Sequence, residues 1–328
     1  MAGKVTMADI AQMAGVTKST VSRYFNGGYV KEETREKIRK AAEANGYSPN
    51  AFARLKARES GVVGVVVPSL NSTISGRVIT SIDRYLREEG YETLIKNSDH
   101  QIQLELANIR RLMSLNVDGI LISSISIVEE HRELLGNSPV PVVVLAQEYP
   151  EGISVVDDDY EAGFAMGKYV GETHPRRAAY LGVTEEDRAV GVVRKRGVLD
   201  GLKSCGVDSI RVLTGDYSYE SGQNMTGQLL AEGGADAIIC ATDRLAFGAY
   251  RILHERGLSI PGDVSVAGFG GYDESTLLAP QLTTVKFDSY AVGYLGAETL
   301  LKCIRREPVP KKQVVSFQLI EGGSVRRP

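Results

Sequence analysis

AGVTKSTVSRYFN, residues 14–26, is the stretch that decides how the N-terminal part of the chain folds. Gly15 is typical of a helix end, and Val16 fills the turn that follows it. Thr17 is typical of an N-cap, and residues 18–26 after it read as a short helix that ends at the Asn-Gly-Gly of 26–28. This pattern predicts two helices separated by a tight turn.

The flanking residues supply the other two helices of a small domain. Thr6 is a second N-cap, and the helix after it carries an apolar stripe of Ile10, Met13 and Ala14. A third helix is expected over about 31–45, ended by Gly46, with its inward face formed by Ile38, Ala41 and Ala42. Two short helices, a tight turn and a third closing helix make a helix-turn-helix unit.

The second helix has an outer face suited to nucleic acid. Val21, Tyr24 and Phe25 are its inward positions, which leaves six polar residues toward solvent: Thr17, Lys18, Ser19, Thr20, Ser22 and Arg23. Short hydroxyls at a helix N-terminus suit phosphate contacts, and Lys or Arg reaches guanine edges in the major groove.

The charge distribution agrees with a DNA-binding N-terminal module. Residues 1–60 carry eleven Lys and Arg against six Asp and Glu, a net charge of +5, whereas the other 268 residues carry −8. A basic module on an acidic body predicts an anionic polymer as the partner of that module alone.

At this point the sequence resembles the lactose/galactose repressor (LacI/GalR) family of bacterial transcription factors. The likeness is carried by TMADIAQMAGVTKSTVSRYFN (6–26) and VKEETREKIRKAAEANGYSPN (30–50). It implies a DNA-binding headpiece over 1–47 and a hinge helix or linker over 48–60. It also implies that Lys18, Ser19 and Arg23 read bases, while phosphate and further DNA contacts come from Thr17, Thr20, Ser22, Asn26, Tyr47, Asn50, Ala53 and Leu55.

The hinge departs from the family pattern by one residue. Family hinges read Ala-Arg-x-Leu, whereas this chain reads Ala53-Arg54-Leu55. Leu55 is the candidate for an apolar wedge that opens the minor groove, or alternatively for a contact with the body of the protein.

Residues 61–328 alternate apolar strands with amphipathic helices in two cycles. Strands are expected at 61–68, 91–97, 119–124, 141–146, 178–183, 210–215, 237–242 and 264–269, and helices at 75–89, 103–116, 160–172, 191–204, 218–232 and 243–256. This alternation predicts an α/β fold with two doubly wound parallel-sheet lobes, whose ligands bind beyond the carboxyl ends of the strands.

The resemblance continues through this body, in ATDRLAFGAYRILHERGLSIPGDVSVAGF (241–269), VVRKRGVLDGL (192–202) and LTTVKFD (282–288). It implies lobes of the periplasmic-binding-protein type. The N-terminal lobe would comprise 61–158 plus 289–310, and the C-terminal lobe 159–288 plus 311–328. The crossovers near 158–160, 288–290 and about 310 would form the hinge between them.

The family likeness also implies an effector site in the inter-lobe cleft. Arg194 falls where the family places a ligand-clamping arginine, and Asp243 either contacts ligand or caps the helix that it opens. Further candidates at strand ends are Ser69, Asn71, Ser124 and Gln147. Gly270-Gly271 and Ala146 stand where sugar-binding relatives often have acids, and Arg77 with the cluster 194–196 adds positive charge.

These departures predict a sugar or a sugar phosphate as the effector and favour the phosphate, because fewer carboxylates mean fewer acceptors for neutral sugar hydroxyls and less repulsion of an anion. The stretches ARLKARES (53–60), VLAQEYPEG (144–152) and ATDRLAFGAYRIL (241–253) are most similar to the trehalose-repressor branch, whose effector is a phosphorylated disaccharide. Ser69 stands where that branch carries an arginine.

Other classes of protein are disfavoured. GxSxG, P-loop, HExxH and GxGxxG motifs are absent, the four histidines fall at expected surface positions, and 157–159 reads as an acidic inter-lobe loop rather than a metal site. We therefore expect no enzyme activity, metal or cofactor. Three scattered cysteines, no apolar run of about 18 residues and no signal peptide favour a cytoplasmic protein without a membrane segment.

The sequence therefore predicts a homodimeric, sugar-responsive repressor of a carbohydrate-utilisation operon that binds a pseudo-palindromic operator. Regulation by a protein corepressor or by a non-sugar metabolite stays open as the alternative.

Overall fold

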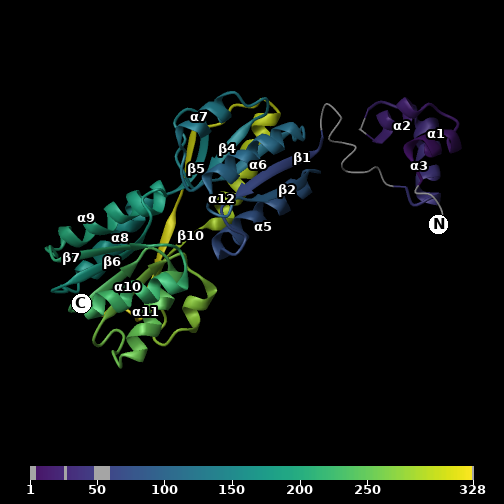
Figure 1. The fold of residues 1–328 in the computed structure, drawn as a ribbon. Coiled ribbons are helices and arrows are strands. Elements are labelled where there is room, and N and C mark those ends of the chain that lie inside the picture. Colours follow the sequence, from purple (N-terminus) through teal and green to yellow (C-terminus); the bar gives the residue numbers. More distant parts are fainter. Residues whose placement is uncertain (1–4, 26–27, 48–59, 327–328) are drawn as a thin grey trace.

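The computed structural model describes residues 5–25, 28–47 and 60–326, which form a three-helix headpiece and two α/β lobes (Figure 1). The headpiece (5–47) comprises α1 (Met7–Met13), α2 (Lys18–Phe25) and α3 (Glu32–Ala44). Thr6 and Asp9 form a reciprocal capping box at the start of α1. The fully buried side chains of Ile10, Val21 and Ile38 bring one residue from each helix into a common core. The expected stripe of α1 is wrong at Met13, which is 54% exposed, because Ala11 and Ala14 face the core instead.

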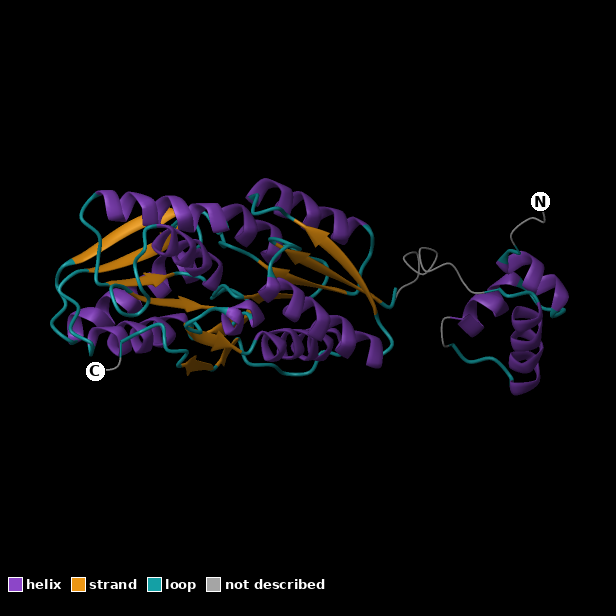
Figure 2. Ribbon diagram, turned by 90° about the horizontal axis from the view of Figure 1, so that it is seen from below, coloured by secondary structure: helices purple, strands orange, loops and turns teal. Residues whose placement is uncertain are grey.

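The first lobe is a six-stranded parallel sheet with helices on both faces (Figure 2). Its strand order is β11-β5-β4-β3-β1-β2. Strand β1, between β3 and β2, is buried along its whole length, as its valine-rich apolar run predicts, since both faces of a parallel sheet are covered. Its strands are β1 (Val62–Val67), β2 (Glu92–Asn97), β3 (Gly119–Ser123), β4 (Val142–Leu145), β5 (Ile153–Asp157) and β11 (Lys312–Val315), and its helices are α5 (Thr73–Glu88), α6 (Ile102–Ser114), α7 (Glu129–Gly136) and α12 (Ser289–Ile304).

The second lobe repeats this architecture with one antiparallel edge. Its strand order is β12-β10-β9-β8-β6-β7, and β12 runs antiparallel to β10. Its strands are β6 (Ala178–Val183), β7 (Ile210–Gly215), β8 (Ala237–Cys240), β9 (Ser265–Phe269), β10 (Thr283–Phe287) and β12 (Phe317–Ile320). Its helices are α8 (Asp159–Gly171), the π-helical turn η1 (Arg188–Arg194), α9 (Lys195–Ser204), α10 (Tyr219–Ala231), α11 (Asp243–Glu255) and the 3-10 turn η2 (Asp273–Leu277).

The chain passes between the sheets at Asp158, Asp288 and Ser316. The expected third crossover near residue 310 is wrong, because β11 pairs with β5 in the first sheet before β12 joins β10 in the second. Residues 311–315 therefore extend the first sheet, and the assignment of 311–328 as a block to the C-terminal lobe is corrected to begin at β12.

Glycines allow α8 and α9 to pack at backbone distance. A Cβ built on Gly163 or Gly167 would lie 2.4 Å from the Arg194 carbonyl oxygen or 2.2 Å from that of Val198. Gly197 and Gly201 make equally close approaches from the α9 side. Because no side chain separates the helices, the start of α8 lies directly against the end of η1, where Asp159 and Arg194 meet.

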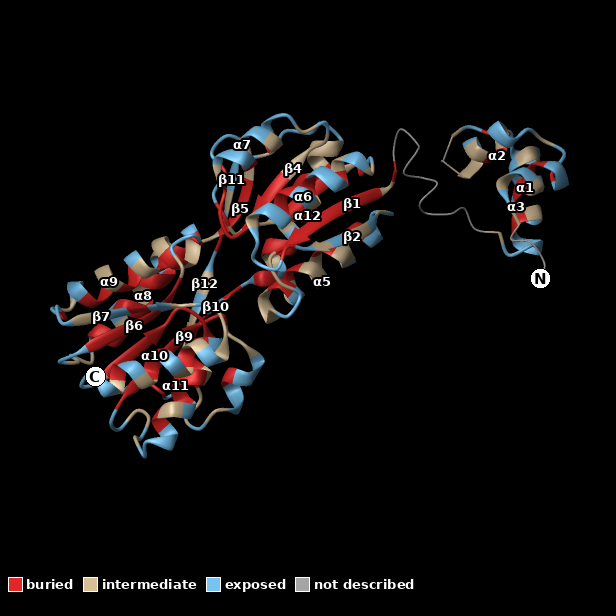
Figure 3. Ribbon diagram, viewed as in Figure 1, coloured by how far each residue is buried: buried red, intermediate tan, exposed pale blue. Residues whose placement is uncertain are grey.

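The inner strands of both lobes form the buried interior, whereas the edge strands β2, β7, β11 and β12 and the outer faces of the helices are partly exposed (Figure 3). No helix within the described ranges is long and apolar enough to cross a membrane.

Candidate DNA-reading helix and inter-lobe cleft

The outer face of α2 carries the residues expected to contact DNA. Thr17, Lys18, Ser19 and Arg23 are exposed, whereas Thr20 and Ser22 are half-buried. The Thr17 hydroxyl accepts from the Thr20 backbone N–H at 3.2 Å and lies 2.8 Å from the Ser19 hydroxyl, so it caps α2 as predicted. The cap fixes the helix N-terminus at which these polar side chains project.

Positive charge in the described headpiece is concentrated on α2 because the basic residues of α3 are already paired. On α3, Lys37 lies 2.7 Å from Glu33, and Arg39 lies 2.7 Å from Glu36 and 3.1 Å from Glu43. Lys18 and Arg23 have no acidic partner within 4 Å among the described residues. Lys18 and Arg23 are therefore the cations that α2 offers to DNA, while Lys4, Arg54, Lys56 and Arg58, which also count toward the +5 of residues 1–60, lie outside the described residues.

Of the remaining headpiece candidates, only Tyr47 belongs to the described residues, and it packs against the headpiece core. Tyr47 packs its ring against Phe25, with the ring centroids 5.6 Å apart, and burial raises the pKa of its hydroxyl. Asn26, Asn50, Ala53 and Leu55 lie outside the described residues.

A cavity of about 350 Å³ lies between the two lobes, at the carboxyl ends of their strands. Its walls come from both sheets, as expected for a ligand site in doubly wound folds. Of the effector residues predicted from the sequence, five line this cavity: Ser69, Asn71, Ser124, Gln147 and Arg194.

Arg194 is buried at the end of η1, between the start of α8 and the segment that follows β8. Its Nε donates to Asp159 Oδ1 at 2.8 Å, its Nη2 lies 2.6 Å from the same oxygen, and its Nη1 donates to the Ala241 carbonyl at 2.9 Å. The guanidinium also lies over the rings of Phe269 and Phe287, 5.1 and 4.8 Å from their centroids. This planar group is therefore rigidly presented to the cavity.

Asp187 joins the lobes across the cleft. It lies in the second lobe as the N-cap of η1, and its Oδ1 accepts from Val190 N at 3.0 Å and from Gln147 Nε2 of the first lobe at 2.9 Å. Tyr217 donates its hydroxyl to the other oxygen and stacks on His100 of the first lobe, with centroids 5.3 Å apart.

Two predicted effector residues, Arg77 and Asp243, do not line the cavity. Arg77 of α5 donates to the Gly271 carbonyl and to Asp273, both at 3.0 Å, and so forms another contact between the lobes. Because its guanidinium already has these partners, it adds no unpaired positive charge to the cleft.

Asp243 is fully buried and anchors the loop after β9. It accepts from Tyr272 N at 2.9 Å, from the Ser275 hydroxyl at 2.8 Å and from the Thr284 hydroxyl at 2.6 Å. Thr242, one residue earlier, is the N-cap of α11. Neither sequence interpretation of Asp243, as a ligand contact or as a helix cap, describes these bonds.

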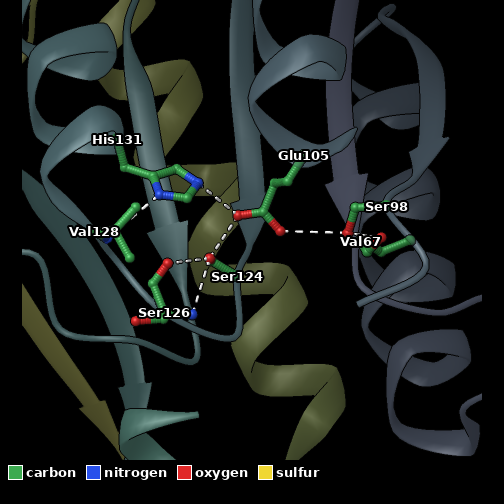
Figure 4. A network of polar contacts seen from close by, with 7 residues as sticks. All are labelled: Val67, Ser98, Glu105, Ser124, Ser126, Val128 and His131. Carbon is green, nitrogen blue, oxygen red and sulfur yellow. Dashed lines mark hydrogen bonds and ion pairs between the residues drawn. The ribbon is translucent and has the colours of Figure 1, made fainter. Parts of the chain in front are cut away.

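A buried polar network supports the cavity wall at Ser124 (Figure 4). Glu105 Oε1 lies 2.6 Å from the Ser124 hydroxyl and 2.9 Å from His131 Nε2, and its Oε2 accepts from Ser98 at 3.3 Å. His131 Nδ1 accepts from Val128 N, so the Nε2 atom carries the proton donated to Glu105. The expected surface position of His131 is wrong: its side chain is fully buried.

Sequence reasoning also missed cleft residues at crossovers and after strands. Asp157, Asp159, Asp187 and Tyr217 all line the cavity. The acidic run at 157–159 was visible, but its three residues have separate roles: Asp158 caps α8 while its neighbours face the cleft. Their position directly after β5 was the available signal.

Comparison with known proteins places this architecture in a family. Residues 6–50 match the family described as "Bacterial regulatory proteins, lacI family", and residues 169–325 match the "Periplasmic binding protein-like domain". Catabolite control protein A of Priestia megaterium is 33% identical over 312 residues, covering 93% of this chain and 94% of that protein. The chain belongs to the LacI family.

Other similar proteins match nearly the full length of this chain. The sucrose operon repressor of Staphylococcus xylosus is 29% identical over 313 residues, covering 95% of this chain and 98% of that protein. A crystal structure of the lac repressor bound to ONPG in the repressed state has a TM-score of 0.86 at 25% identity, covering 98% of this chain and all of that one. As a LacI-family member, the protein is a DNA-binding transcriptional regulator and not an enzyme.

Proposed function

We propose that this protein is a sugar-responsive repressor of a carbohydrate-utilisation operon. It binds a pseudo-palindromic operator as a homodimer in the cytoplasm, and a sugar or sugar phosphate in the inter-lobe cleft changes its affinity for that operator. One observation carries this proposal: the same chain combines exposed Lys18 and Arg23 side chains, which have no acidic partner within 4 Å among the described residues, with an inter-lobe cavity of about 350 Å³ whose two sides are joined by the Gln147–Asp187 hydrogen bond.

In the DNA complex, α2 would enter the major groove. Lys18, Ser19 and Arg23 would contact base edges, and Thr17, Thr20, Ser22 and Asn26 would contact or position against phosphates. Tyr47 supports α2 from the core side, while Asn50, Ala53 and Leu55 would contact the operator near its centre.

In the cleft, Arg194 and Gln147 would contact the effector, with Ser69, Asn71 and Ser124 contributing hydroxyl and amide groups. Gln147 already donates a hydrogen bond to Asp187 of the other lobe. A ligand bound here would either replace this hydrogen bond or add hydrogen bonds to the same two side chains. Ligand binding thereby alters the relative position of the lobes, and hence of the two headpieces in a dimer. By linkage, operator DNA must change effector affinity by the same factor.

The test begins with the full-length protein and a random pool of duplex DNA, from which bound sequences are selected. The expected result is a site with two inverted half-sites, bound by two chains per duplex in light scattering. A selected site without inverted symmetry, or no selection at all, would contradict the proposal.

The second step adds sugars to the selected complex. Release or tightening of the complex by a sugar or sugar phosphate supports the effector assignment. If no sugar changes operator affinity while a partner protein or another metabolite does, the alternative regulation by corepressor or non-sugar metabolite replaces it.

A further inference from the structure

Asp157 is a cleft residue that carries an unused hydrogen-bond acceptor. It ends β5, lines the cavity, and its buried Oδ1 has no hydrogen-bond partner. Within the described residues, three other buried side-chain oxygens lack a partner, and none of them belongs to a residue that lines the cavity: Thr93 Oγ1, Tyr180 OH and Ser289 Oγ. An unpaired buried acceptor is costly, so this atom is placed where a ligand can satisfy it.

The cations near Asp157 are already engaged. Arg194 makes two contacts with Asp159 and one with Ala241, and Arg77 is held by Gly271 and Asp273. The ionisable acids and arginines that line the cavity are Asp157, Asp159, Asp187 and Glu274 against Arg194 and Arg244. The cleft therefore has an excess of carboxylates over guanidinium groups.

This electrostatic balance opposes an anionic ligand. Burial, reinforced by the charge of Asp159, raises the pKa of Asp157 to about 7, in keeping with two carboxylates placed close together in this wall of the cleft. A hydroxyl donor instead satisfies Oδ1 without adding charge. The carboxylates absent at Ala146 and Gly270-Gly271 are thus replaced by others that sequence reasoning did not place in the cleft.

We propose that Asp157 determines ligand class in this cleft: it accepts a hydrogen bond from a hydroxyl of an uncharged sugar and disfavours the phosphorylated form of the same sugar. This inference rests on the proposed sugar-sensing function and narrows it. It replaces the sequence-based preference for a sugar phosphate, which relied on the positive charge of Arg77 and Arg194.

The first test uses the full-length wild-type protein and matched pairs of ligands. Thermal unfolding is followed by circular dichroism with glucose, sucrose, trehalose and cellobiose, and with glucose 6-phosphate, sucrose 6-phosphate and trehalose 6-phosphate. We expect stabilisation by an uncharged sugar, with at least tenfold weaker binding of its phosphate in calorimetry. Stronger binding of the phosphorylated member of a pair would overturn the role of Asp157 while leaving sugar sensing intact.

The second test compares Asp157→Asn with Glu161→Gln. Both remove one carboxylate, but Glu161 is exposed on the first turn of α8 and does not line the cavity. Asp157→Asn is expected to weaken binding of the uncharged sugar about tenfold, or about 1.4 kcal/mol. It should also reduce the ratio between the affinities for the uncharged sugar and for its phosphate. Glu161→Gln should bind both as wild type does.

The outcomes separate the two levels of inference. Wild-type affinity in Asp157→Asn, with an unchanged preference between the paired ligands, would refute the role of Asp157. If neither class of sugar stabilises the wild-type protein, the sugar-sensing proposal and this inference fall together. The paired comparison on wild-type protein remains decisive even if the variant does not fold.

Discussion

Removal of the Glu105 side chain is expected to destabilise the first lobe strongly. Glu105 is 2% exposed on α6, and its carboxylate serves three buried side-chain donors, from Ser98, Ser124 and His131. Glu105→Ala leaves His131 Nε2 without its acceptor in an enclosed space, whereas the Ser98 hydroxyl keeps the Val67 carbonyl at 3.1 Å and the Ser124 hydroxyl keeps the Ser126 carbonyl at 2.8 Å.

The size of the effect follows from this geometry. Each buried donor left unsatisfied costs about 1–3 kcal/mol, and removal of one partner of a buried hydrogen-bonded acid–base pair costs about 3–5 kcal/mol. Because Ser98 and Ser124 keep carbonyl acceptors, the cost comes from the broken His131–Glu105 pair, and we expect about 3–5 kcal/mol. At about 2–4 °C per kcal/mol for a domain of this size, the melting temperature falls by roughly 6–20 °C.

Thermal and urea unfolding followed by circular dichroism measure this change, since the chain has no tryptophan. Glu130→Ala is the matched control, because Glu130 is exposed at the start of the neighbouring helix α7 and its loss should stay within about 0.5 kcal/mol. Glu105→Gln keeps one acceptor oxygen and should lie between the two. A melting temperature of Glu105→Ala within 2 °C of the control would refute the buried network as a stabilising element.

Four further outcomes follow from the structure. Arg23→Ala should weaken operator binding by about 1–3 kcal/mol in fluorescence anisotropy and relax the sequence preference at the base that Arg23 contacts, whereas Arg39→Ala, whose guanidinium is paired on α3, should change affinity less. Gly167→Ala should cost about 1–3 kcal/mol in urea unfolding, because its Cβ would overlap the Val198 carbonyl, whereas Gly76→Ala enters open space on α5 and should not destabilise. Arg77→Ala should change stability by less than about 1 kcal/mol, since Asp273 is largely exposed, but should increase the radius of gyration in X-ray scattering by loosening the lobes. Because the pKa of Asp157 is raised to about 7, the folded protein binds more protons than the unfolded chain between about pH 4 and 7. The stability of the wild-type protein should therefore fall relative to that of Asp157→Asn as the pH rises through this window. A difference in stability that stays constant from pH 5 to 8 would contradict the raised pKa.

Sequence reasoning succeeded where local signals determine structure. The Thr6 cap, the Thr17 cap and the buried valine strand each depend on residues close together in the chain, and the structure confirms all three. The alternation of strands and helices also left few possible topologies, because parallel strands require crossover helices.

The predictions that were missed or wrong concern residues whose structure depends on contacts with distant parts of the chain. The short strand β5 lies against an acidic run, and the polar helix α7 has little apolar periodicity, so neither produced a clear pattern. His131 was expected at the surface because no residue near it in the sequence indicates its partner Glu105, which lies 26 residues away. Asp243 likewise sits at a family ligand position, yet its partners Tyr272 and Thr284 come from distant segments.

The same long-range contacts explain how a small ligand can control the relative position of the lobes. The bridges across the cleft are few and polar: Gln147 to Asp187, Arg77 to Gly271 and Asp273, and Arg188 N to the Ile125 carbonyl at 3.3 Å. At about 0.5–1.5 kcal/mol each, they amount to a few kcal/mol together, whereas micromolar binding supplies about 8 kcal/mol.

Only the difference between a ligand's affinities for the open and closed forms shifts their populations, and a nearly complete shift needs about 5.5 kcal/mol. A ligand that contacts both lobes in the closed form alone could supply a difference of this size. The Arg188 bridge follows Ser124 directly, and Ser124 is held by Glu105 and His131. The buried network thus keeps one side of the cleft in the conformation that the second lobe contacts. We therefore expect a ligand to act on the polar bridges between the lobes rather than on the packed interior of either lobe.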